Sequence, residues 1–288
     1  MKKAMRHTAV AAAVLVIAAA LVFAGCAPAE DEQEVTLLYV EWVGEVASTY
    51  VAAVVLEEMG YEVDTISVSA AAMWEGIASG DGDAMTSAWL PGTHGAYLEQ
   101  TQDRVEEVGV VMTGARIGLM VPTYVDIDTV ADLEEYADRF DNRIVGIDPG
   151  AGLMSATEEA LEVYGLDSID LLEGSDATMV AALEDAYRNE EWVVVTGWTP
   201  HVKEARFDLK YLEDPELVFG EEEYVASIVR SGLADEKPEV YEFFTNFSWS
   251  VEAFADLMLW NDEPGSDPYA NAQRWVEENR SLVDSWIN

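Results

Sequence analysis

The chain has 288 residues, half of them hydrophobic, and a formal net charge of −41 from 15 basic and 56 acidic residues. This length and apolar content exclude a disordered acidic tail and allow two lobes with sizeable cores. The acid excess excludes a nucleic-acid partner, which needs a basic footprint. It also predicts a protein of a salt-loving bacterium, because about 1 M salt shortens the Debye length to about 3 Å and screens the repulsion.

Residues 1–25 are predicted to be a lipoprotein signal peptide. Basic residues near the start are followed by an apolar run over 9–24 and then by Ala24-Gly25-Cys26, an order typical of secretory signals. The run is shorter than the roughly 20 apolar residues of a comfortable transmembrane helix. Cys26 is the predicted lipidation site, so we expect an extracytoplasmic protein anchored to the cell membrane. An ordinary cleaved signal peptide with an incidental or buried cysteine is the alternative.

The chain after the signal peptide begins with a polar, acidic segment. Residues 26–34 are predicted to form a flexible stalk. Cys26 is the only cysteine, which excludes an intramolecular disulfide.

A first α/β unit is predicted over 35–115. We expect strands at 35–40, 61–68 and 84–88, with helices at 47–59 and 70–79 between them. This alternation of strands and helices implies parallel strands with helical crossovers.

A second α/β unit is predicted over 121–205, after an apolar strand at 116–122. We expect helices at 127–139, from 152 to 164 and at 177–188, strands at 144–147, 169–172 and 192–195, and an extended run at 209–212. The tail from Pro238 is predicted to be helical, rich in aromatic residues and packed on the first unit.

These units predict an α/β fold of two lobes, one formed by 35–116 plus 212–288 and the other by 117–211. Crossings near 116–121 and 207–213 would join them. That is the layout of a hinged binding protein with its ligand in the cleft between the lobes.

The sequence contains no pattern that points to an enzyme. It has no Gly-x-Ser-x-Gly elbow, no Walker loop and no catalytic cysteine. The two histidines beyond the signal peptide, His94 and His201, lack the spacing of a zinc site. We therefore expect binding without turnover, with no catalytic residue, no metal and no cofactor.

Three tryptophans are the candidate binding residues. Trp42, Trp89 and Trp198 each follow a β-like run and precede a Gly or Pro, which places them at strand ends, where α/β proteins bind ligands. Such rings, facing one another, form a box for a quaternary ammonium. Core packing is the alternative for each of them. We expect core packing for the others, namely Trp74, Trp192, Trp249, Trp260, Trp275 and Trp286.

The glycine-rich turn at 148–152 opens a predicted helix and suits an anion. It is too short for a nucleotide phosphate and lacks a lysine, but a single carboxylate fits. A plain strand-to-helix turn is the alternative. His94 is a possible second donor to the carboxylate, or else a surface histidine, whereas His201 is expected to make a local structural hydrogen bond. An aromatic box beside an anion site predicts a zwitterion such as glycine betaine.

The motifs at 89–94, 147–154, 194–201 and 208–212 resemble those of the glycine betaine-binding lipoproteins of osmoprotectant ABC importers. This resemblance implies the type II periplasmic binding-protein fold and docking on the importer's membrane subunits. It also implies a tryptophan prism of Trp42, Trp89 and Trp198 around the trimethylammonium. The carboxylate would be held by His94 and by the backbone amides of Gly152 and Leu153.

The chain departs from that family at Val202, where many members have a second aromatic residue. The ligand range therefore stays open to choline, carnitine, proline betaine or a dimethylsulfonium zwitterion. Two alternatives of another class are a lipoprotein hydrolase and a surface scaffold.

Overall fold

The computed structural model describes residues 33–287, and residues 35–287 belong to one compact unit. The predicted signal peptide, Cys26 and the predicted stalk up to residue 32 lie outside the described residues. Within the described part of the chain, no helix has the length and apolar character needed to cross a membrane.

The first α/β unit has the predicted elements. They are β1 (Glu34–Tyr39), α2 (Val43–Glu58), β2 (Glu62–Ser67), α3 (Ala70–Ser79), β3 (Ala84–Leu90) and a further short helix α4 (Gly95–Thr101). Helix α3 begins where expected because the Ser69 hydroxyl accepts a hydrogen bond from the Ala72 N–H, and it ends at Gly80 in the left-handed conformation.

The second unit begins on an unusually long strand. Its elements are β4 (Val105–Pro122), the 3-10 helices η1 (Val130–Leu133) and η2 (Ala137–Phe140), β5 (Arg143–Val145), α5 (Gly152–Val163), β6 (Asp170–Leu172), α6 (Asp176–Arg188), β7 (Val195–Thr199), α7 (Val202–Arg206) and β8 (Leu209–Tyr211). The predicted strand at 116–122 is therefore only the second half of β4.

The helix predicted at 127–139 is wrong, because this segment forms two 3-10 turns instead. The Asp132 carboxylate accepts hydrogen bonds from the backbone N–H groups of Asp128 and Thr129. Such side-chain bonds compete with a continuous helix. The strand predicted at 192–195 also differs, since β7 begins at Val195 and Trp192 precedes it.

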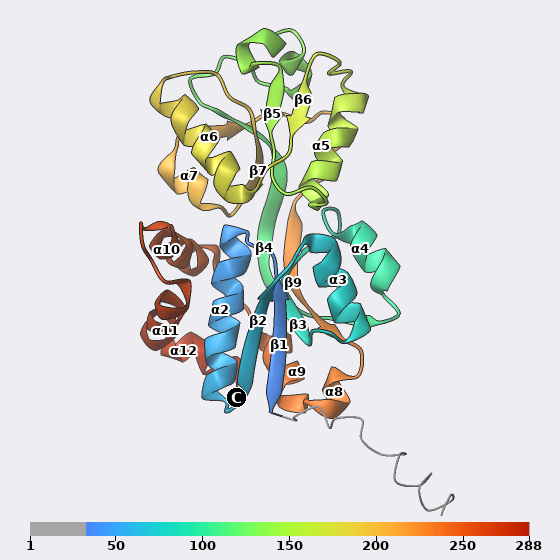
Figure 1. Ribbon diagram of the computed structural model, residues 1–288, viewed down its shortest axis with the longest axis vertical. Helices are drawn as coiled ribbons and strands as arrows, with labels where there is room; N and C mark the ends of the chain where they lie inside the picture. The colour runs from blue at the N-terminus through green and yellow to red at the C-terminus, as the bar shows by residue number, and fades with distance from the viewer. Residues whose placement is uncertain (1–32, 288) are drawn as a thin grey trace, which may run out of the picture. The chain divides into compact units, whose positions relative to one another are not determined.

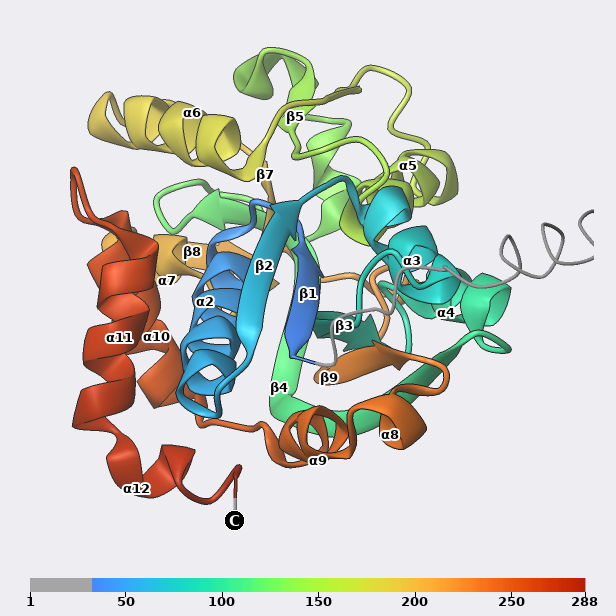
Figure 2. The ribbon, with the colours of Figure 1, turned by 60° about the horizontal axis from the view of Figure 1, so that its bottom comes forward.

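The chain returns to the first unit and ends in helices. Its last elements are β9 (Glu223–Arg230), α8 (Leu233–Glu236), α9 (Pro238–Asn246), α10 (Val251–Asp262), α11 (Pro268–Glu278) and α12 (Arg280–Val283). Strand β9 was not predicted. Helices α10 and α11 pack against α2, as expected of the tail, and Figures 1 and 2 both show them beside it.

We place the return crossing at 220–222, later than the predicted 207–213. Residues just after β8 still bond to the second unit, since Leu212 N–H donates to Leu119 O and the Tyr164 hydroxyl donates to Asp214. Beyond Gly220 the chain enters β9 and pairs with the first unit.

One strand joins two sheets. The strand order is β2-β1-β3-β9-β4-β7-β5-β6, with β8 also on β4. Residues 105–115 of β4 pair antiparallel with β9, whereas residues 116–122 pair with β7 and β8. Figure 1 shows β4 running from the lower group of elements into the upper one. Lobe I here means 35–115 with 223–287, and lobe II means 116–222.

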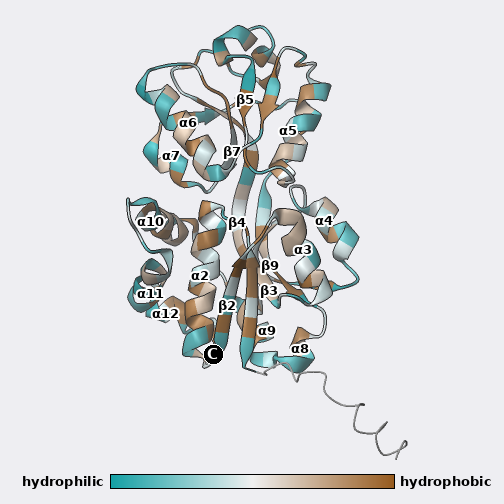
Figure 3. Cartoon of the chain, viewed as in Figure 1, coloured by the Kyte–Doolittle hydropathy of each residue, from teal (hydrophilic) through white to brown (hydrophobic). Residues whose placement is uncertain are grey.

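The core lies between each sheet and its helices. In Figure 3 the apolar colours follow the strands and the inward helix faces, with polar colours outside. An aromatic cluster lies among the C-terminal helices of lobe I, where Trp249, Trp275 and Trp286 are buried with Phe243 and Phe247. These three tryptophans confirm the predicted core role. Trp74 is also buried, while Trp192 and Trp260 are partly buried against the core.

Candidate ligand-binding site

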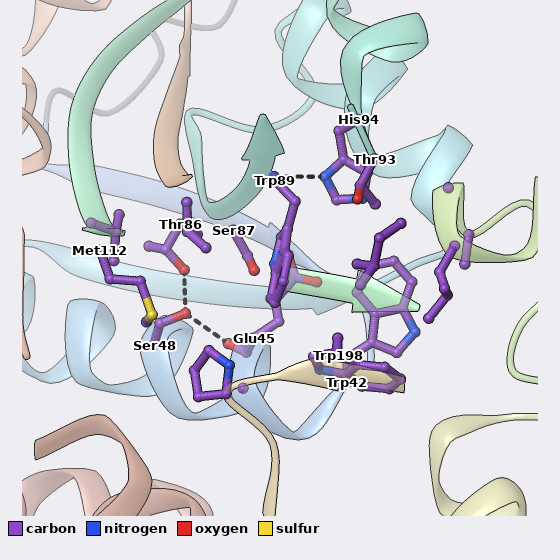
Figure 4. Close-up of a pocket in the computed structure, with 18 of the residues that line it drawn as sticks. Trp42, Glu45, Ser48, Thr86, Ser87, Trp89, Thr93, His94, Met112 and Trp198 are labelled. Carbon is purple, nitrogen blue, oxygen red and sulfur yellow. Dashed lines mark hydrogen bonds between the residues drawn. The ribbon is translucent and has the colours of Figure 1, made fainter. Parts of the chain in front are cut away.

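A pocket between the lobes contains all six predicted binding residues. It is lined from lobe I by Trp42, Trp89 and His94, and from lobe II by Gly152, Leu153 and Trp198. Each of them comes from the end of a strand or the start of a helix. In the view of Figure 4, Ser48, Thr86 and Met112 lie on one side of Trp89, and Trp42 and Trp198 lie on the other.

Trp42 is held in place from the opposite lobe. Its indole N–H donates a 3.1 Å hydrogen bond to the Asp148 carboxylate, and the side chain is buried. Trp42 is also the N-cap residue of α2 but offers no capping side chain. This bond satisfies the indole N–H and leaves the ring faces to the pocket wall.

Trp198 lies at the end of β7 against a buried basic group. The Lys203 ammonium is 3.7 Å from the centre of the Trp198 ring, and the His201 ring meets the indole edge-to-face at 4.4 Å. Burial lowers the pKa of Lys203 to about 7 and that of His201 to about 4. His201 also accepts a hydrogen bond from the Lys203 N–H, which confirms its predicted local structural role.

His94 presents a single donor to the pocket. Its Nδ1 accepts a 3.0 Å hydrogen bond from the Trp89 N–H, so in the neutral ring Nε2 carries the proton. Burial lowers the pKa of His94 to about 4, which keeps the ring neutral at neutral pH. Nε2 is buried and has no hydrogen-bond partner among the described residues. The buried N–H is therefore a donor available to a ligand oxygen.

The N-terminus of α5 lines the same pocket as this donor. Gly152 and Leu153 are the first two residues of the helix, so their N–H groups have no acceptor within it. A Cβ at Gly152 would lie 1.9 Å from the Thr93 carbonyl oxygen of lobe I. Only glycine allows so close an approach, which brings the positive end of the α5 dipole beside Thr93, the residue before His94.

The loop carrying Thr93 and His94 is fixed by a buried carboxylate. Glu223, at the start of β9, accepts hydrogen bonds from the N–H groups of Gly92 and Thr93 at 2.7 Å each and from the Thr93 hydroxyl at 2.5 Å. Glu223 was not predicted, because nothing local distinguishes it from its acidic neighbours Glu221 and Glu222.

A second acid was also missed, and it lines the pocket itself. Glu45 lies in the first turn of α2 and is only 2% exposed. Neither of its carboxylate oxygens accepts a hydrogen bond of normal geometry within the described part of the chain, and only the Val40 N–H approaches them. Other residues of the wall that were not predicted include Ser87, Val111, Ile117, Pro200, Val225 and Phe254.

The pocket thus combines indole rings with N–H donors that converge from both lobes. Rings of this kind attract a cation that cannot donate hydrogen bonds, whereas a neutral imidazole N–H and a helix N-terminus attract an anion. Within residues 33–287 no cluster of three or more His, Cys, Asp or Glu side chains is arranged to hold a metal ion.

Comparison with known proteins identifies the family of this chain. The OpuAC family model, described as the substrate binding domain of ABC-type glycine betaine transport systems, matches residues 33–278. The glycine betaine/carnitine transport binding protein GbuC of Listeria monocytogenes is 38% identical over 181 residues, which are 62% of this chain. The match spans 58% of that relative's length.

Two crystal structures resemble the whole described fold. The glycine/betaine/L-proline-binding protein ProX of Borrelia burgdorferi is 37% identical with a TM-score of 0.87, over 88% of this chain and 97% of that one. Lactococcal OpuAC, in its closed conformation with glycine betaine, is 35% identical with a TM-score of 0.84, over 89% of this chain and 100% of that one. The likeness confirms the predicted two-lobed α/β binding-protein fold.

Proposed function

Since this chain belongs to the OpuAC family, the substrate-binding domains of ABC-type glycine betaine transport systems, we propose that it captures glycine betaine or a related betaine outside the cell for an ABC importer. Uptake of such a solute would serve osmoprotection. The role of the chain is then to bind and deliver, without chemical turnover.

One observation carries this proposal: a single pocket joins Trp42, Trp89 and Trp198 to the donors of His94 and helix α5. A trimethylammonium among the indole faces gains roughly 0.5–2 kcal/mol from each well-placed ring. The carboxylate of the same ligand accepts from His94 Nε2 and from the N–H groups of Gly152 and Leu153. Glycine betaine is a short molecule, so one pocket can bind both its trimethylammonium group and its carboxylate.

The proposed mechanism is closure around the ligand. Trp42, Trp89 and His94 belong to lobe I, whereas Trp198 and the start of α5 belong to lobe II. A ligand that contacts both sets stabilises the closed form in proportion to its greater affinity for that form. The closed form would then dock on the membrane subunits of the importer.

Calorimetry against glycine betaine, proline betaine, carnitine, a dimethylsulfonium zwitterion, choline and proline tests the ligand class. We expect tight binding of betaines and a change in tryptophan fluorescence. Choline lacks the carboxylate, so choline binding as strong as that of glycine betaine would replace our choice of ligand. If none of these ligands changes the melting temperature of the protein, the surface-scaffold alternative is favoured. If a ligand is cleaved and a product is released, the hydrolase alternative is favoured.

We further propose that the protein is tethered by a lipid on Cys26, with residues 26–33 as the stalk, because Glu34, the last residue of the predicted stalk, already belongs to β1. Support comes from the Ala24-Gly25-Cys26 motif after the apolar run. Mass spectrometry of the membrane-bound protein should find a diacylglyceryl group on Cys26. Release of the Cys26→Ser variant into the medium is the expected companion result, and equal membrane retention of both forms would contradict the tether.

A further inference from the structure

Glu45 occupies a position in the pocket that the architecture of α2 does not explain. As the third residue of the helix, a glutamate commonly bonds back to the N-cap N–H. Here the N-cap N–H, that of Trp42, donates instead to the Val40 carbonyl oxygen at 2.7 Å. The Glu45 carboxyl group is therefore not used as a cap, although it is almost completely buried.

The hydroxyl groups of the nearby wall are also engaged elsewhere. Ser48 and Thr86 share a 2.6 Å hydrogen bond between their hydroxyls, and Ser48 Oγ lies 3.2 Å from the Glu45 backbone carbonyl. Figure 4 shows both interactions beside Trp89. The carboxyl group of Glu45 thus lines the pocket with no charged partner and no hydrogen bond of normal geometry among the described residues, although the Val40 N–H approaches it. Burying a carboxylate in that state costs free energy unless a ligand compensates it.

Burial raises the pKa of Glu45 well above its usual value, and the Val40 N–H offsets this only in part. No charged side chain contributes to that shift. The other charged or titratable groups on the surrounding elements are exposed Glu41 before α2, neutral His94 in the wall, and Asp176, which bonds to the start of α2. Lys203 and His201 lie beside Trp198 on α7.

We propose that Glu45 is the counter-charge of the ligand's quaternary ammonium, and that ligand binding drives the Glu45 proton into solvent. The step leaves the ligand unchanged: the carboxylic acid becomes a carboxylate, and the proton passes to the buffer. The cation attracts the ionised form and so favours it. This inference rests on the proposed function, because it needs a cationic head in the aromatic part of the pocket.

The same charge balance makes Glu45 a specificity determinant. Glycine betaine brings its own carboxylate and adds no net charge to the pocket, whereas choline adds one positive charge. Glu45 should therefore matter more for choline than for glycine betaine. Binding of either ligand should strengthen as pH rises, by at most about tenfold per pH unit while Glu45 starts protonated.

The test is calorimetry of glycine betaine and choline at pH 6 to 9, in buffers of different ionisation enthalpy, on wild type, Glu45→Gln and Glu41→Gln. Glu41 is exposed and outside the pocket wall, so it is the matched control. We expect wild type and Glu41→Gln to release up to one proton per ligand. Glu45→Gln should release none, and its affinity should fall by about tenfold for choline and by less for glycine betaine.

Lys203 provides the sharpest rival, because its pKa of about 7 also lies in this range. Proton release that persists in Glu45→Gln and disappears in Lys203→Met would assign the proton to Lys203 and overturn the proposal. If wild type binds with the same enthalpy in every buffer, the proposal is wrong while the proposed function stands. If no betaine and no choline bind to any variant, both are wrong.

A second measurement uses only wild-type protein, so its result does not depend on whether a variant folds correctly. In wild-type protein, infrared difference spectra on adding glycine betaine should lose a protonated carboxylic acid band and gain a carboxylate band from the protein. Isotopically labelled ligand separates its own carboxylate signal from that of Glu45. An unchanged carboxylic acid band would overturn the proposal.

Discussion

Asp176 of lobe II accepts a 3.1 Å hydrogen bond from the backbone N–H of Val43, the first residue of helix α2 in lobe I. The other oxygen of Asp176 bonds to His201 Nε2 at 3.0 Å. Burial opposes ionisation of Asp176, yet His201, Lys203 and the Val43 N–H together lower its pKa. Because the N-cap residue Trp42 offers no capping side chain, the opposite lobe caps α2 when the lobes are together.

Asp176→Ala should therefore weaken closure. A lost cap costs about 1 kcal/mol, and the Val43 N–H and His201 would both lose their acceptor. We expect glycine betaine to dissociate about tenfold faster in stopped-flow fluorescence, with little change in the association rate. Asp170→Ala, an exposed acid on β6 of the same lobe, is the matched control. A dissociation rate unchanged by Asp176→Ala would mean that the contact does not stabilise the closed form.

Gly152→Ala tests the close approach of the lobes. The added Cβ would lie 1.9 Å from the Thr93 carbonyl oxygen, so α5 cannot reach its closed position. We expect affinity to fall by about a hundredfold, an effect of roughly 3 kcal/mol as expected for an overpacked contact. Thermal stability without ligand should change little, because the open lobes leave room. Ser155→Ala, on the exposed side of the same helix, should bind like wild type. Full affinity in Gly152→Ala would show that the ligand binds without this contact.

The indole box is tested by removing one ring at a time. Trp89→Ala and Trp198→Ala should each lower affinity for glycine betaine by about tenfold or more, since a ring contributes roughly 0.5–2 kcal/mol. Trp260→Ala is the control, because Trp260 is partly buried on α10 and packs against Arg274 outside the pocket. Wild-type affinity in both pocket variants, measured by calorimetry, would remove the box from the proposed mechanism.

The parts of the site that the sequence predicted carry local signals. Trp42, Trp89 and Trp198 stand at strand ends before Gly or Pro, and the turn at 148–152 is rich in glycine. These features are local to the sequence and do not depend on how the lobes are arranged. They could therefore be recognised without a structure. The structure places these residues in one pocket, and their role in ligand binding stays a prediction.

The acids that position the site could not be identified in this way. Glu45, Asp176 and Glu223 are buried, yet they are three among 56 acidic residues with similar neighbours. What distinguishes Asp176 and Glu223 is a contact with a distant segment, such as Glu223 with Gly92 and Thr93. What distinguishes Glu45 is its burial in the pocket wall. The same applies to β9, which is fixed by its pairing with β3 and β4 rather than by a strong local pattern.

The pH dependence of stability should reflect His94. Its pKa is about 4 in the folded protein and 6.5 is its ordinary value, so between these values the unfolded chain binds more protons and stability falls as pH falls. Glu45 acts in the opposite direction, because its folded pKa is raised. The comparison must therefore be made between variants. We expect the melting temperature of His94→Gln to fall less than that of wild type when the pH is lowered from 7 to 5. An equal fall in both proteins would contradict a neutral, buried His94.

His94→Gln should also retain part of its ligand affinity. The N–H groups of Gly152 and Leu153 still meet the carboxylate, and the glutamine amide supplies a donor. We expect a larger loss in His94→Ala, of about tenfold to a hundredfold, because the lost hydrogen bond is made to a charged carboxylate. Complete loss of binding in His94→Ala, measured by calorimetry, would make His94 the chief anchor and the helix N-terminus secondary.

Added salt should stabilise this protein. A protein whose stability depends on surface ion pairs would instead be destabilised by salt. Fifty-six acidic residues face only 15 basic ones, so repulsion dominates the long-range electrostatics. Exposed pairs such as Arg104–Glu75 contribute little, and their screening costs little. We expect the melting temperature to rise steadily from 10 mM to about 1 M KCl, where the Debye length shortens from about 30 to 3 Å. Sucrose at matched osmolality controls for solute exclusion, and it should give a smaller rise. A melting temperature that falls with KCl would contradict adaptation to concentrated salt.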